Sequence, residues 1–148
     1  MKGSIICIGN RFIEEDAAGL QVFDRLQKMQ PLPAGISLVE GGLAGLDLLP
    51  HLEQGGRVVF VDAVKGVTGA GNIVVLKQQE ILQTPSQRQF DHVAGLPYLL
   101  AVLPKVCDGV LPEEIFLLGL EGRCEGETFD EAARLSIAIA EHGLRDMG

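Results

Sequence analysis

The sequence predicts an α/β fold: a three-layer αβα domain on a five-stranded, mostly parallel, twisted sheet of the kind found in phosphorylases and hydrolases. Two observations lead to this prediction. Short aliphatic, β-branched runs alternate with segments of helical period, which is typical of strand and helix layers. Several of the runs are apolar at consecutive positions, as expected of parallel strands covered on both faces. Because 148 residues is the usual size of one domain, we expect a single domain over residues 1–148.

Five runs carry the strand pattern. The predicted strands are Ser4–Ile8, Ile36–Glu40, Arg57–Asp62, Asn72–Lys77 and Ile115–Leu120. The first, third and fifth are continuously apolar and therefore belong in the interior of the sheet. The fourth follows a glycine-rich stretch and leads into polar sequence, which favours an edge position. Cys7 lies within the first strand, and we interpret it as a small core residue.

Segments of helical period separate the strands. The predicted helices are Asp16–Met29, Ala44–Leu52, Ala94–Leu103 and a last helix near the end of the chain. Thr128 and Glu131 have the T-x-x-E spacing of a capping box, which predicts the start of the last helix, and Gly143 is placed to end it. The polar stretch Gln78–Asp91 contains Pro85 and has no clear period, so it predicts a long loop.

Charge and composition exclude several classes of protein. The net charge is −8 and no run of Lys or Arg is present, so nucleic acid is not an expected partner. The apolar runs are far shorter than the roughly 20 residues that span a bilayer, and the start of the chain does not resemble a signal peptide. Three cysteines without C-x-x-C spacing indicate free thiols in a reducing compartment. We expect a cytoplasmic protein without membrane insertion.

Polar residues that follow strands are the first candidates for a site, because ligands bind at the carboxyl ends of the strands in open α/β sheets. Asp62 follows the apolar run 58–61. Its carboxylate should emerge at the sheet edge with little water, where a metal would supply the missing positive charge. The alternative is a turn or N-cap aspartate that accepts hydrogen bonds from local backbone N–H groups.

Two further candidates lie on other loops. Asp16 follows Glu14 and Glu15 at the start of a predicted helix, where the helix dipole favours acidic residues whatever their function. Three adjacent carboxylates nevertheless repel one another, and a cation would relieve the repulsion. His92 precedes the predicted helix that contains Pro97, a place also typical of surface or capping histidines. Residue types and spacing leave both the metal-binding and the local structural interpretations open.

A glycine-rich segment offers a different kind of site. Gly41–Gly45 follows the second predicted strand, and its glycines would let the backbone approach a ligand closely or bind a phosphate at the next helix. The stretch 8–12 after the first strand lacks the G-x-G-x-x-G of dinucleotide-binding folds. The hypothesis of a nucleotide-binding domain therefore depends on Gly41–Gly45 alone.

Taken in order along the chain, several short motifs resemble those of the hydrogenase maturation endopeptidase family. They are Cys7–Asn10, Glu15–Gly19, Glu40–Gly45, Asp62-Ala63 and His92. The family opens with a strand, a G-x-G-N-like turn and an acidic pair, and its second signature is an acidic residue before G-G-T-x-G. The chain differs from it at Glu40, where the family has aspartate, at Leu43, where it has threonine, and after the fifth strand, where a proline is missing.

The resemblance implies an endopeptidase that removes the C-terminal extension of a nickel-iron hydrogenase large-subunit precursor after nickel insertion. Carried over from the family, Asp16, Asp62 and His92 are the expected metal ligands and catalytic residues, with Glu15 as an alternative to Asp16. The expected metal is nickel, held by the protein or supplied by the substrate, with cadmium or zinc as substitutes in vitro. The precursor is the expected partner.

The resemblance leaves two questions open. The metal either polarises the peptide carbonyl or its bound water, or it only positions the substrate while Asp16 or Asp62 acts as general base. The departures at Glu40 and Leu43 motivate an alternative function, a noncatalytic nickel-responsive accessory or chaperone protein with the same fold.

Overall fold

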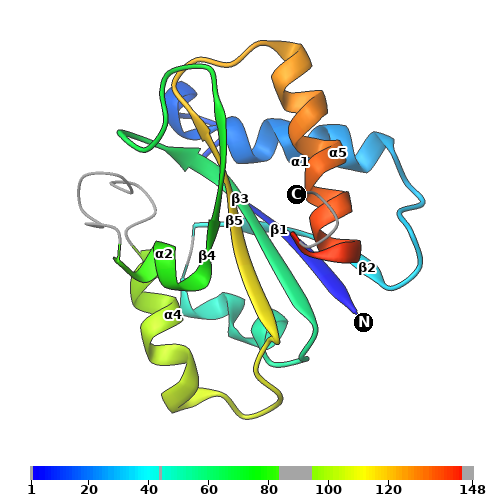
Figure 1. The fold of residues 1–148 in the computed structure, drawn as a ribbon, viewed down its shortest axis with the longest axis vertical. Coiled ribbons are helices and arrows are strands. Elements are labelled where there is room, and N and C mark those ends of the chain that lie inside the picture. Colours follow the sequence, from blue (N-terminus) through cyan, green and yellow to red (C-terminus); the bar gives the residue numbers. More distant parts are fainter. Residues whose placement is uncertain (1, 44, 84–94, 145–148) are drawn as a thin grey trace.

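A computed structural model describes residues 2–43, 45–83 and 95–144 and shows one five-stranded sheet between two layers of helices (Figure 1). The strands are β1 (Gly3–Ile8), β2 (Ile36–Gly42), β3 (Arg57–Val64), β4 (Ile73–Lys77) and β5 (Glu114–Glu121). Their spatial order is β2-β1-β3-β5-β4. The pairs β1–β2, β1–β3 and β3–β5 are parallel, and β4 runs antiparallel to β5 at one edge. The predicted fold class and the edge position of the fourth strand are confirmed.

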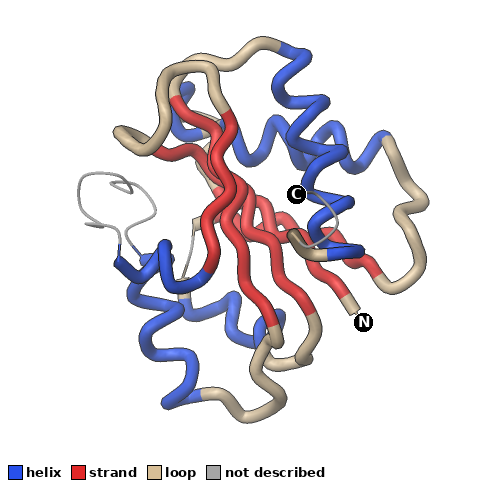
Figure 2. The backbone as a smooth tube through the Cα atoms, in the orientation of Figure 1, coloured by secondary structure: helices blue, strands red, loops and turns tan. Residues whose placement is uncertain are grey.

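Different helices cover the two faces of the sheet (Figure 2). Each face carries its own hydrophobic cluster. Helices α1 (Ala18–Lys28) and α5 (Gly126–His142) cover one face. The 3-10 helix η2 (Leu46–Leu52) and helices α2 (Gln78–Gln83) and α4 (Gly95–Val106) cover the other. Side chains alternate between the faces along each strand, so successive apolar residues of β1, β3 and β5 are all buried.

Cys7 illustrates this alternation. It lies on the α1 side of β1, between Ile6 and Ile8 of the opposite face, and is completely buried, as predicted for a core residue. Burial, followed by the nearby negative charges of Asp62, Glu40 and Asp24, raises the pKa of its thiol. Because the thiolate is the metal-binding form, this environment disfavours metal binding by Cys7.

The first predicted helix is divided in two. Residues Glu14–Asp16 form the short 3-10 helix η1, and α1 begins only at Ala18. Asp16 therefore lies in a tight turn before the helix rather than in its first turn. The apolar residues Leu20, Phe23 and Leu26 of α1 are buried against the sheet.

The capping-box prediction for the last helix is wrong. Helix α5 begins at Gly126 after the N-cap Glu125, and no N-cap side chain bonds the backbone. The N–H of Thr128 already donates to the carbonyl of Glu125, so Thr128 lies inside the first turn. The C-terminal prediction is confirmed, because Gly143 has a positive φ of 69° and its N–H donates to the carbonyl of Ile139.

The long-loop prediction is wrong at its start. Residues Gln78–Gln83 form α2, and the carboxylate of Glu80 accepts the N–H of Lys77 at 2.8 Å just before the helix. The remainder of the predicted loop lies outside the described residues. The predicted helix Ala44–Leu52 is the 3-10 helix η2, with Pro50 inside it.

A partly buried ion pair stabilises the amino end of the sheet. The guanidinium of Arg57, the first residue of β3, donates to Glu114 at 2.7 Å and to the carbonyl of Ala140 at 3.1 Å. These contacts join β3, β5 and α5 at the edge opposite to the strands' carboxyl ends. Within the part of the chain that the structure describes, no helix is long and apolar enough to span a membrane.

Candidate functional site

Asp62 lies inside β3 rather than at its end. The strand continues to Val64, so Asp62 is 0% exposed and lies beside Gly119 of β5. Its Oδ1 accepts the N–H of the adjacent Ala63 at 2.7 Å. Burial raises the pKa of Asp62 well above its ordinary value, the Ala63 N–H bond opposes that rise, and the charge of Asp16 adds to it. The expectation that its carboxylate emerges at the sheet edge is therefore wrong, since Asp62 is buried within the strand.

Asp16 is the inward member of the acidic cluster. It is 1% exposed, whereas Glu14 and Glu15 are exposed. Two backbone bonds close the turn around it: the N–H of Asn10 donates to the Asp16 carbonyl at 3.0 Å, and the Asp16 N–H donates to Ile13 at 2.9 Å. The structure thus shows that Asp16 is buried and Glu15 is exposed, a difference that the sequence did not reveal.

Glycine makes this turn possible. Gly9 has a φ of 154°, and a Cβ there would overlap the carbonyl oxygen of Asp16. Only a residue without a side chain lets the end of β1 approach the backbone of η1 this closely. The glycine after the first strand therefore serves to position Asp16.

The structure brings Asp16 and Asp62 together at the carboxyl end of the sheet. η1 contacts β3, and the charge of Asp16 contributes to the raised pKa of Asp62. His92, the third predicted site residue, lies outside the described residues, and the described chain resumes at Gly95 with α4. Among residues 2–43, 45–83 and 95–144, no group of three or more His, Cys, Asp or Glu side chains is arranged to hold a metal ion.

The chemistry of the two carboxylates fits part of a cation site. Two buried, neighbouring carboxylates repel each other in a medium of low dielectric, and a divalent cation or a bound proton relieves that repulsion. Carboxylate oxygens together with an imidazole suit a borderline divalent metal. Asp16 and Asp62 would thus supply oxygen ligands from two different elements.

A groove of about 900 Å³ lies beside the two aspartates. It is lined by residues from the segments that follow β1, β3 and β5: 11–21, 64–65 and 122–124, together with Phe129 of α5. Glu15 and Ala17, the neighbours of Asp16, are among them, as is Val64 at the end of β3. The groove is therefore lined by residues close in sequence to both aspartates, although neither aspartate is itself among the lining residues.

Sequence reasoning missed several residues of this groove. Lys65 and Arg123 directly follow β3 and β5, so the rule that directed attention to Asp62 could also have found them. Phe12 is 96% exposed at the groove although it is a large apolar residue. An exposed aromatic side chain at the rim suits contact with another polypeptide.

Arg11 was also missed, and it joins three segments around the site. Its guanidinium forms a bidentate pair with Asp24 of α1 at 2.9 and 3.0 Å and reaches Glu40 of β2 at 3.4 Å. The hydrogen bond to Asp24 is the main cause of the raised pKa of Arg11 and of the lowered pKa of Asp24. Glu40, one of the departures from the family signature, thus takes part in holding the loop that precedes Asp16.

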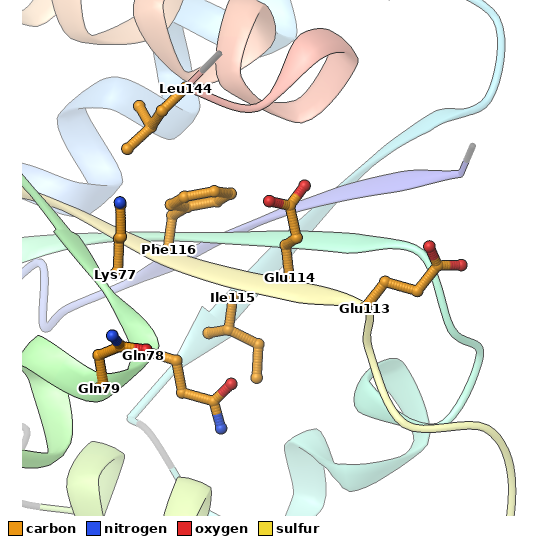
Figure 3. A pocket seen from close by; sticks show the side chains of 8 residues that line it. All are labelled: Lys77, Gln78, Gln79, Glu113, Glu114, Ile115, Phe116 and Leu144. Carbon is orange, nitrogen blue, oxygen red and sulfur yellow. The ribbon is translucent and has the colours of Figure 1, made fainter.

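A second hollow of about 260 Å³ lies at the other end of the molecule (Figure 3). In Figure 3, Lys77, Phe116 and Glu114 point toward Leu144, and Ile115 points to the opposite side of the sheet. Its only acidic residue inside β5, Glu114, is already paired with Arg57. This hollow lies at the amino end of β5, whereas Asp62 lies beside Gly119 near the carboxyl end of that strand. The hollow does not form part of the candidate site.

Comparison with known proteins identifies the family of the chain. The family model "Hydrogenase maturation protease" (HycI) matches residues 20–139. The chain belongs to the hydrogenase maturation protease family. The predicted family and endopeptidase class are confirmed. Membership implies a metal-dependent protease that acts on a hydrogenase large subunit. The matched range contains Asp62 and His92 and begins after Asp16.

Curated relatives of this family are similar to most of the chain. The hydrogenase 2 maturation protease of Escherichia coli K12 is 24% identical over 121 residues, which are 81% of this chain and 73% of the relative. The hydrogenase expression/formation protein HoxM of Azotobacter vinelandii is 25% identical over 118 residues, which are 79% of this chain. This chain spans just over half, 56%, of the length of the Azotobacter relative.

Solved structures of family members share the fold. The hydrogenase maturating endopeptidase HybD from E. coli superposes with a TM-score of 0.75 at 21% identity, covering 100% of this chain and 94% of that chain. The hydrogenase maturation protease HybD from Thermococcus kodakarensis gives a TM-score of 0.65 at 22% identity, covering 95% and 97%. These similarities establish that the mixed, mostly parallel sheet with its flanking helices is the architecture of the family.

Proposed function

We propose that this protein cleaves the C-terminal extension from a nickel-iron hydrogenase large-subunit precursor after nickel has been inserted. The observation that carries the proposal is the pair of buried carboxylates, Asp16 and Asp62, beside a groove of about 900 Å³. The pair offers ligands for a cation, and the groove offers room for the peptide that must be cut. Family membership supplies the class of substrate.

In this proposal Asp16, Asp62 and His92 bind the nickel carried by the precursor. Two carboxylates and an imidazole suit nickel, and cadmium or zinc accept the same donors. The metal, when bound, would polarise a carbonyl or a water molecule, or it would only position the substrate. The backbone bonds that close the η1 turn hold Asp16 in place, and β5 holds Asp62 through its pairing with β3. The groove keeps the extension extended next to these residues.

If the metal only positions the substrate, Asp16 or Asp62 would act as the general base. Burial raises the pKa of Asp62 in the metal-free protein. Asp62 is completely buried and therefore protected from bulk water in the metal-free protein.

Incubation of purified protein with a nickel-loaded precursor tests the proposal, with mass spectrometry of the precursor as the readout. We expect loss of the C-terminal extension with the unaltered protein and no loss with Asp16→Asn, Asp62→Asn or His92→Ala. Glu15→Gln is the matched control for Asp16→Asn, because it removes the neighbouring but exposed carboxylate. Full processing by the Asp16 variant would assign the site to other residues.

The same experiment examines the alternative of a noncatalytic accessory or chaperone protein. Leu43, in place of the family's threonine, is 59% exposed and offers no hydroxyl. If that hydroxyl is needed for cleavage, the precursor would bind stably and keep its extension. Leu43→Thr would then restore cleavage, whereas cleavage by the unaltered protein excludes the alternative.

A further inference from the structure

The last residue of β5 holds the loop between β3 and β4. One carboxylate oxygen of Glu121 accepts the backbone N–H groups of Val67 at 2.8 Å and Thr68 at 2.7 Å. The backbone of Glu121 also bonds the loop, because its carbonyl accepts the N–H of Gly71 at 2.7 Å and its N–H donates to Asn72 at 3.0 Å. A single residue therefore contacts the beginning and the end of the loop.

The loop depends on such bonds for its shape. Its glycines Gly66, Gly69 and Gly71 all have positive φ, and glycine-rich backbone loses more conformational entropy on ordering than other sequence. Most of the loop is exposed, so apolar burial contributes little to its order. Bonds from backbone N–H groups to a carboxylate are charge-assisted and roughly twice as strong as neutral ones. The bond from Thr68 is the main cause of the lowered pKa of Glu121.

The position of this loop connects it with the groove. Val64 and Lys65, which line the groove, immediately precede the loop, and Gly122, Arg123 and Cys124, which also line it, immediately follow Glu121. Glu121 lies opposite Val64 in the β3–β5 register, two positions beyond Asp62. The carboxylate thus joins the two segments that form one wall of the groove.

We propose that Glu121 is a positioning residue that fixes the β3–β4 loop and so holds this wall of the groove in place for the precursor's C-terminal segment. The inference rests on the proposed function for the identity of the peptide. Loss of Glu121 should weaken capture of the precursor and leave the chemical step nearly unchanged.

The kinetic test uses the two glutamates at the ends of one strand. Glu121→Ala is compared with Glu114→Ala, which removes the partner of Arg57 at the first residue of β5. For Glu121→Ala we expect KM for the nickel-loaded precursor to rise about tenfold with little change in kcat, since two charge-assisted bonds are lost. Glu114→Ala should lower the melting temperature without raising KM. Equal KM values for the two variants would overturn the proposal.

A conservative variant separates positioning from general damage. The amide oxygen of Glu121→Gln can still accept both N–H bonds, although without the charge. Its KM should fall between those of the unaltered protein and Glu121→Ala. A Glu121→Gln variant as impaired as Glu121→Ala would contradict the role of these bonds.

Hydrogen exchange gives a readout that does not depend on cleavage. In the absence of precursor, the amides of Val67 and Thr68 should exchange faster in Glu121→Ala than in Glu114→Ala, at matched global stability. Unchanged exchange at these amides would refute the proposed role of Glu121. If the unaltered protein binds the precursor without cutting it, the protease proposal fails while the dissociation constants of the same variants still decide the role of Glu121.

Discussion

Replacing Gly19 by alanine sets helix propensity against packing. In an exposed helix the change would stabilise by no more than about 1 kcal/mol. At Gly19, however, the new methyl group would overlap the carbonyl oxygen of Ile8 and lie 2.6 Å from that of Val61. Both are backbone atoms of interior strands, β1 and β3, so neither can rotate away as a flexible side chain would.

The structure indicates which effect is larger. Overpacking a closely packed interior costs about 1 to 3 kcal/mol, and contact with two backbone carbonyls places Gly19 at the upper end of that range. The net loss of unfolding free energy is then about 2 kcal/mol. For a domain of this size the melting temperature should fall by about 4 to 8 °C. Because α1 must move away from β1 and β3, Asp16 should move with it, and precursor processing should decrease as well.

Gly126→Ala is the matched control. Gly126 is the first residue of α5, and a Cβ there would meet only Arg25 Nη2 at 3.7 Å, an ordinary contact. Urea unfolding of both variants measures the two free energies. We expect Gly126→Ala to be at least as stable as the unaltered protein and fully active. A Gly19→Ala variant equal to Gly126→Ala in stability and activity would refute the proposed packing of α1 against the sheet.

Three further predictions concern the charged residues. Asp62→Asn should raise the melting temperature of the metal-free protein, measured by scanning fluorimetry. Burial disfavours the charged carboxylate, which is why the pKa of Asp62 is raised, and a neutral amide avoids the cost of burying a charge. The variant should also lose the stabilisation that added nickel or cadmium gives the unaltered protein. The pKa of Glu121 is lowered in the folded state, so its contribution to stability is present above the unfolded pKa of about 4.5 and is lost as the pH falls through the lower folded value. In urea titrations from pH 7 to pH 3, the unfolding free energy of Glu121→Gln should therefore fall less steeply with decreasing pH than that of the unaltered protein. The same dependence of the unfolding free energy on pH in both proteins would contradict this. Arg11→Gln removes the ion pairs with Asp24 and Glu40, which are exposed. It should therefore lower the unfolding free energy by less than about 1 kcal/mol while raising KM for the precursor. A larger loss of stability without a change in KM would show that Arg11 stabilises the fold and does not contribute to precursor binding.

The sheet could be predicted from sequence because its signal is local. Continuous apolar runs such as 58–61 cannot be exposed on either face, so they indicate interior parallel strands without knowledge of their neighbours. Each predicted strand is found within two residues at either end. Strand ends are less certain because the polar residue that follows an apolar run can still pair with the adjacent strand, as Asp62 does with β5.

The helix starts were predicted less well because they depend on contacts between distant residues. The interruption between η1 and α1 follows from the approach of Gly9 to Asp16, which the periodicity of residues 16–29 does not reveal. The start of α5 differs from the T-x-x-E prediction because no N-cap side chain bonds the backbone there. A capping motif shows only that a bond is possible.

The sequence by itself determined the fold class, the strand order along the chain and the types of residue at the carboxyl end of the sheet. Only the tertiary structure decided that Asp16 turns inward while Glu15 is exposed, that Asp62 is buried, and that Glu121 holds the loop beside the groove. The physical reason is range. Hydrophobic periodicity acts between near neighbours, whereas the burial of a carboxylate and its hydrogen-bond partners depend on segments that meet only after the sheet has formed.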